Sequence, residues 1–266
     1  MVEQGTQGKR HALGLAVALL GTVLAASPAK AETFKAEYIV SIFGITIART
    51  SFTSELNADR YAVNGTISSS GMAAIFDDTK GIVQASGQLR DDVTSPTTYA
   101  LDYTSGKKKQ RTTVRLENNN VVATENVPPP KPRRHGWVPV EAADLVDVVD
   151  PLTATLVRAR SLDDVCNRTA RIYDGELRAD LTLTYLNKAP AVVGDFKGDS
   201  VTCSVRFKPI SGYRKGSKTI EYLAAGNRMQ VTFARMGDTT FFVPLRGQVE
   251  TRIGTVHIRL GKINDV

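Results

Sequence analysis

The stretch CNRTARIYDGELRADLTLTYLNKAPAVVGDFKGDSVTC, residues 166–203, begins and ends with the only two cysteines of the 266-residue chain. Apolar side chains alternate with polar or charged ones over 177–185, which is the period of a strand with one buried face. Cys203 is in phase with Val205, so it should lie on the buried face of the following strand. We therefore expect a small meander closed by a disulfide between Cys166 and Cys203.

Two other uses of these cysteines are a metal site and a redox or nucleophilic site. Cysteines 37 positions apart with no histidine nearby make a poor zinc set, and the chain has no Cys-x-x-Cys motif. A cross-link across this loop contributes about 4 kcal/mol in the chain-entropy treatment. That is a large share of the roughly 5–15 kcal/mol by which domains are stable. A structural disulfide is therefore preferred, and we expect neither a metal nor a cofactor.

Residues 1–31 have the features of an export signal. Basic residues at positions 9 and 10 precede an uncharged apolar run at 12–26, and Ala29-Lys30-Ala31 matches the small-x-small pattern of signal peptidase sites. The alternative is a retained membrane anchor, but the run is shorter than the roughly 20 apolar residues that span a bilayer. We expect cleavage after Ala31, a periplasmic mature chain and no transmembrane segment after cleavage. Disulfides persist in that compartment.

The chain is moderately basic, with a formal net charge of +7, of which +5 remains after residue 31. In an exported protein a nucleic-acid partner is not expected, whereas lipopolysaccharide, phospholipid headgroups or peptidoglycan carboxylates are plausible anionic surfaces. Two groups of basic residues could contact such a surface. The first follows a tight turn and the second lies in a proline-rich segment: Lys107, Lys108, Lys109 and Arg111, then Lys131, Arg133 and Arg134. The simpler interpretation is a solvated surface.

Strand patterns separated by turn signals recur about every ten residues along the mature chain. Phe34–Phe43 and Ile45–Phe52 flank Gly44 as a hairpin, and similar alternation continues to Val256–Leu260. We expect an all-β protein: one long antiparallel meander over 32–266, curled into a half-barrel or open barrel. A curled sheet of this width can enclose an apolar cavity.

The pattern breaks once, at 127–150, where Val127-Pro128-Pro129-Pro130 favours an extended crossover and excludes a central strand. Asp150-Pro151 then resembles a helix start, and apolar residues follow at helical spacing. We expect the main helix at Pro151–Arg160, packed on the concave face, with Leu152 and Leu156 lining the cavity. A domain boundary at the crossover is the rival interpretation. A short helix is also possible at Lys218–Ala224.

Motifs spread over nearly the whole mature chain resemble one family. They are Arg60-Tyr61, the Gly81–Gly87 strand, Tyr99-x-Leu101-x-Tyr103 with Ser105-Gly106-Lys107, Val127-Pro128-Pro129-Pro130, Asp150-Pro151-Leu152-Thr153-Ala154 and the paired cysteines. This combination resembles the proteobacterial envelope family called domain of unknown function 3108, and it implies no catalytic residues. The chain is more distantly similar in plan to periplasmic β half-barrel envelope-integrity proteins and lipoprotein carriers.

Candidate catalytic residues are few. His135 lies in the crossover, and His257 alternates with Val256 and Ile258, so it should face solvent. The paired carboxylates, such as Asp163-Asp164, are adjacent in sequence and are typical of turns. No nucleophile-elbow, zinc-protease or phosphate-loop motif is present in the sequence.

Three classes of function therefore remain. The first is a non-enzymatic envelope protein that binds a lipid, a lipoprotein or a protein partner in its concave face, with a role in envelope maintenance. The second is a hydrolase of envelope glycan or lipid, and the third is a structural partner in an envelope complex. Two facing carboxylates in a cavity would favour the hydrolase, whereas an aliphatic and aromatic lining would favour binding.

Overall fold

The computed structural model describes residues 1, 32–70, 79–90, 93–130, 135–226 and 228–265. The predicted export segment, apart from Met1, lies outside these residues, as do Lys131, Arg133 and Arg134. No helix in the described ranges is long and apolar enough to cross a bilayer.

The all-β prediction is confirmed by one large antiparallel sheet with β10 and β7 at its edges. The strand order is β10-β11-β12-β14-β15-β16-β1-β2-β3-β4-β5-β6-β7, and β9 pairs with β15. The strands are β1 (Glu32–Ile42), β2 (Ile45–Leu56), β3 (Arg60–Ser69), β4 (Thr79–Arg90), β5 (Val93–Ser105), β6 (Lys108–Glu117), β7 (Asn120–Val127), β9 (Val157–Arg158), β10 (Arg168–Tyr173), β11 (Arg178–Val193), β12 (Phe196–Ser211), β14 (Met229–Arg235), β15 (Phe241–Thr251) and β16 (Gly254–Asp265). A separate pair is formed by β8 (Trp137–Val138) and β13 (Tyr213–Arg214).

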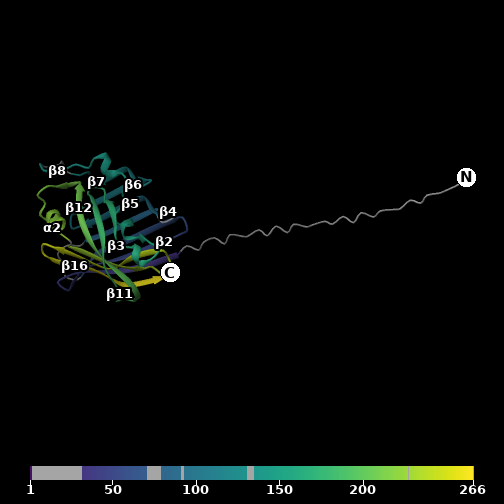
Figure 1. Ribbon diagram of the computed structural model, residues 1–266. Coiled ribbons are helices and arrows are strands. Elements are labelled where there is room, and N and C mark those ends of the chain that lie inside the picture. The colour runs from purple at the N-terminus through teal and green to yellow at the C-terminus, as the bar shows by residue number, and fades with distance from the viewer. Residues whose placement is uncertain (2–31, 71–78, 91–92, 131–134, 227, 266) are drawn as a thin grey trace.

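The sheet is curved, and Figure 1 shows the green strands β11 and β12 running across the blue and teal strands behind them. In the described part of the chain β7 and β10 do not pair with each other. The crossover lies between these two edges instead. Val148 N donates to Asn119 O at 2.7 Å, next to β7, and Val149 N donates to Arg171 O of β10 at 2.8 Å. The sheet is therefore an open barrel whose gap is bridged by the crossover.

The interior of the curve is filled by the protein's own side chains. The main core cluster joins residues from β1 to β6 with residues from β10, β15, the crossover, the segment 152–156 and the β14–β15 turn: Phe34, Leu56, Tyr61, Val63, Ala85, Leu89, Tyr99, Val114, Leu116, Val148, Leu152, Leu156, Tyr173, Met236, Phe241 and Val243. Since strands far apart in the sheet order contribute to it, this cluster must lie inside the curve. Leu152 and Leu156 belong to it.

The predicted helix at Pro151–Arg160 is wrong. Only a single 3-10 turn forms, at Thr153–Thr155, and β9 follows it at once. The cap works as expected, because Asp150 Oδ1 accepts from the backbone N of Leu152 at 2.9 Å and of Thr153 at 2.8 Å. The chain then pairs with Phe241 and Phe242 of β15. The β-branched residues in this segment favour that extended path over further helical turns.

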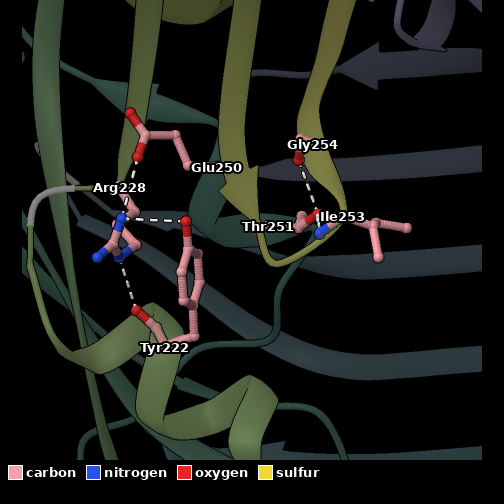
Figure 2. A network of polar contacts seen from close by, with 6 residues as sticks. All are labelled: Tyr222, Arg228, Glu250, Thr251, Ile253 and Gly254. Atoms are coloured by element: carbon pink, nitrogen blue, oxygen red, sulfur yellow. Dashed lines mark hydrogen bonds and ion pairs between the residues drawn. The ribbon is translucent and has the colours of Figure 1, made fainter.

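The short helix predicted at Lys218–Ala224 is present as α2. Arg228 holds it against β15, as Figure 2 shows: its guanidinium donates to Tyr222 O at 2.9 Å, to Tyr222 OH at 3.1 Å and to Glu250 Oε2 at 3.1 Å. The guanidinium carbon also lies 3.9 Å from the centre of the Tyr222 ring.

The predicted disulfide is confirmed, with 5.8 Å between the Cα atoms of Cys166 and Cys203. Both residues are buried in a second core cluster that includes Val165, Val201 and Phe242. The cross-link therefore ties the segment after β9 to the middle of β12.

Candidate functional site

The β11–β12 hairpin projects beyond the strands that flank it. Both strands have 16 residues, but β14 pairs with β12 only over Val201–Val205. The projecting end folds against β15 and β16, where Arg246 Nη2 donates to Val192 O at 3.0 Å. The backbone of Gly194 approaches Gly261 so closely that no Cβ would fit there. This turn therefore needs glycine both for contact and for its φ of +57°.

A groove of about 630 Å³ lies between this hairpin end and the strands β14, β15, β16 and β1. Its polar lining includes the neutral amides of Asn187, Gln230 and Gln248 and three basic side chains. The basic residues are Arg246, His257 and Arg259, and no carboxylate lines the groove. We call it the arginine groove.

Arg246 and Arg259 are directly opposite each other across the β15–β16 pair, and Gln248 is opposite His257 in the next pair on the same face. Like charges in opposite positions of a sheet destabilise it. None of the ion pairs formed among the described residues involves either arginine. The pair is therefore uncompensated positive charge in a concave surface, where the field is concentrated. Planar guanidinium groups match the oxygens of phosphate and carboxylate.

A second groove, of about 380 Å³, lies near the segment that follows β9, and Leu162, Phe196 and Phe242 are among its lining residues. Its one basic residue, Arg235, donates to Thr239 O at 2.9 Å and to Arg160 O at 3.0 Å. Because this guanidinium already hydrogen-bonds to two loops, its role is structural.

The predicted basic cluster lies on the β5–β6 hairpin and lines neither groove. Lys107 and Lys109 are exposed. Lys108 Nζ lies 5.5 Å from the ring centre of Tyr103, and a hydrogen bond with that side chain raises the pKa of Lys108. Arg111 pairs with Asp102 at 2.8 Å. Two of the four charges thus have local partners.

The predicted cavity-lining residues, Leu152 and Leu156, pack in the main core and line neither groove. His257 is exposed, as its phase indicated, but its place in the arginine groove was not foreseen. His135 is exposed in the crossover. No cluster of three or more potential metal ligands occurs among the residues that the structure describes.

A buried polar chain runs from the crossover to β3. Tyr61 OH lies 2.7 Å from Thr153 Oγ1, which donates to Asp150 Oδ2 at 2.5 Å. Burial raises the pKa of Asp150, and burial also raises the pKa of Tyr61. Neither groove is lined by these residues. The chain therefore fixes the crossover inside the sheet, which is a structural role.

Comparisons with known proteins identify the family of this chain. No curated protein matches it. The fold is similar to the crystal structure of a β-barrel-like protein of domain of unknown function DUF1849 from Brucella abortus, with a TM-score of 0.46, 9% identity, and coverage of 90% of this chain and 99% of that one. The family described as "Protein of unknown function (DUF3108)" matches residues 33–260. The chain belongs to the DUF3108 family.

Proposed function

We propose that this protein is a non-enzymatic periplasmic binding protein of the cell envelope, and that the arginine groove holds the anionic headgroup of an envelope lipid. The proposal refines the expectation of a lipid or lipoprotein ligand. A disulfide in an exported chain is compatible with this location.

One observation carries the proposal: Arg246 and Arg259 face each other without a carboxylate in a groove of about 630 Å³. That volume is within the range of small-molecule sites. An arrangement that costs stability in the empty protein becomes favourable when a phosphate lies between the two guanidinium groups. Amide side chains at Gln230 and Gln248 could donate to further ligand oxygens.

The filled interior favours a headgroup site over an internal lipid cavity. Leu152, Leu156 and Phe241 occupy the space that an acyl chain would need. Facing carboxylates would favour a hydrolase, but the smaller groove has Asp199 as its one carboxylate and the arginine groove has none. Binding is therefore the better-supported class.

The test is isothermal titration of the mature chain with monomeric short-chain phosphatidylglycerol at low salt. The double variant Arg246→Gln, Arg259→Gln should bind at least about tenfold more weakly. The matched control is Arg115→Gln on β6, an exposed arginine outside both grooves, which should bind like the wild type. Equal binding by the wild type and the double variant would refute the proposal. Short-chain phosphatidylcholine and inorganic phosphate, titrated in parallel, separate headgroup recognition from general phosphate binding.

A further inference from the structure

The turn between β1 and β2 contains a phenylalanine, Phe43, in a backbone conformation that bulky residues rarely adopt. Ile42 pairs with Ile45, so Phe43-Gly44 forms a two-residue loop with φ of +52° and +78°. Positive φ at both positions is the pattern of a type I′ turn, for which Asn-Gly is the preferred sequence. A phenylalanine at positive φ is an outlier. The residue is 74% exposed, so little burial offsets the cost.

The same chain contains a turn of this kind with the expected residues. Glu117 pairs with Asn120, and Asn118 and Asn119 between them have φ of +50° and +63°. Asparagine tolerates this backbone at small cost. The needs of the turn therefore do not explain Phe43, and its contact with Gly254 leaves most of the residue exposed.

A second exposed apolar side chain projects from the neighbouring hairpin. The ring of Phe43 lies against Gly254 at the β15–β16 turn, where a Cβ would be 2.6 Å from Phe43 Cζ. The adjacent Ile253 is 76% exposed, and Ile45 is 52% exposed. We call Phe43, Ile45 and Ile253 the apolar tip.

The turn that carries Ile253 is braced, as Figure 2 shows. Thr251 Oγ1 donates to Gly254 O at 2.7 Å and accepts from Ile253 N at 3.3 Å, and the Ile253 side chain extends away from the strands. A braced turn presents its side chain at a low entropic cost of binding.

The charges around the apolar tip are mainly positive. Arg252 is exposed beside Ile253, and the carboxylate of Glu250 is already paired with Arg228. Every neighbouring pair from β1 to β5 is antiparallel, so the β1–β2 and β5–β6 turns lie at the same end of the sheet. That end therefore also carries the exposed Lys107 and Lys109.

We propose that this end docks on an anionic bilayer, with Phe43 and Ile253 entering the boundary between headgroups and acyl chains and Arg252 remaining at the phosphates. Peripheral binding of this kind combines buried apolar area with attraction to anionic lipids. A bilayer fits better than a protein because three side chains on projecting turns supply far less area than the roughly 1,200–2,000 Å² of a stable interface. The docking surface is separate from the arginine groove and does not depend on it.

The test is co-flotation of the mature chain with vesicles of phosphatidylethanolamine and phosphatidylglycerol, compared with phosphatidylcholine vesicles. Phe43→Asn creates the preferred Asn-Gly turn, so its thermal midpoint should equal or exceed that of the wild type while vesicle binding falls about fivefold. Adding Ile253→Ser should bring the loss above about tenfold. The matched control is Val122→Thr on β7, a residue 52% exposed like Ile45, which should float like the wild type.

Two outcomes would overturn the docking proposal. Unchanged flotation of the Phe43→Asn, Ile253→Ser variant would remove it directly, and a thermal midpoint several degrees lower for Phe43→Asn would make Phe43 a structural residue. The alternative occupant of the apolar tip is a second copy of the chain. In that case the wild type would not float with vesicles, sedimentation would show a dimer, and the apolar-tip variants would be monomers. Binding of short-chain phosphatidylglycerol, measured by titration, should be unchanged in the apolar-tip variants. The docking proposal can therefore fail or succeed independently of headgroup binding in the arginine groove.

Discussion

The interior of the curved sheet and the arginine groove differ in whether their charged groups have partners within the protein. Inside, the fully buried carboxylate of Asp150 accepts three hydrogen bonds, and Thr153 links it to Tyr61. In the groove, Arg246 and Arg259 face each other with no carboxylate between them. Most buried polar groups in proteins are hydrogen-bonded within the fold, whereas exposed charges can remain available. The difference indicates that the interior is structural and that the groove is where a ligand could bind.

The largest expected effect comes from the cross-link beside the interior. Replacing Cys166 and Cys203 with serine should lower the free energy of unfolding by about 4 kcal/mol, because the unfolded chain regains the freedom of a long loop. Urea unfolding of the variant and of the wild type measures the difference. Addition of reductant should affect only the wild type. Equal midpoints without reductant would show that the bond constrains little.

A comparable effect should follow from Leu156→Ala. This side chain is 6% exposed in the main core cluster, so truncation should cost about 2–5 kcal/mol. If the interior were the open apolar cavity expected from the sequence, the cost would be well below that range. Thermal and urea unfolding distinguish the two cases, and titration with short-chain phosphatidylglycerol should give unchanged binding for the folded variant.

Asp150 tests how the interior accommodates a charge. Burial raises the pKa of this carboxyl above its ordinary value of about 3.9, so the folded state binds the proton more tightly than the unfolded state. The free energy of unfolding should therefore fall as pH rises from about 4 through the raised pKa. Asp150→Asn removes this titration and can still accept from the backbone of Leu152 and Thr153.

Measured from about pH 4 to about pH 8, the stability of the wild type relative to Asp150→Asn should decline. Asp150→Ala leaves the two backbone donors unpaired and should cost about 1–3 kcal/mol at either pH. A difference between wild type and Asp150→Asn that does not change with pH would contradict the assignment of the titration to this residue.

Local patterns in the sequence predicted the features that depend on local physics. The phase of Cys203 with Val205 predicted that both side chains lie on the buried face of a strand, and both are buried on β12. The Asp150 cap was also predicted correctly. The path of the chain after this cap depends on the edge of β15, which comes much later in the sequence and offers β9 a partner. No local pattern could reveal that pairing with β15 would win over a longer helix after Asp150.

The arginine groove was missed for a related reason. Its positive pair exists only because the β15–β16 turn sets Arg246 opposite Arg259, and its wall is formed by the end of the β11–β12 hairpin. The turn before Gly254 could have suggested the register, but not the packing of the hairpin. Leu152 and Leu156 were expected on the concave face, but the sequence could not show that Val148 of the crossover and residues from both sides of the sheet would fill the space around them.

The smallest effect concerns the two arginines themselves. Arg259→Gln removes a like-charge contact and should raise the free energy of unfolding by about 0.2–1 kcal/mol at low salt. Arg246→Gln removes the same repulsion but also the hydrogen bond to Val192 O that holds the hairpin end, so its stability should change less or fall. Near 1 M salt, where charges are screened beyond about 3 Å, the gain from Arg259→Gln should disappear. Because the Arg115 partners across the sheet are Thr98 and Ala123, Arg115→Gln should show no such salt-dependent gain. Urea unfolding of the three variants at both salt concentrations measures these differences. A stabilisation by Arg259→Gln that accompanies weaker binding of short-chain phosphatidylglycerol would mean that the charge in the groove serves a ligand at the expense of the fold.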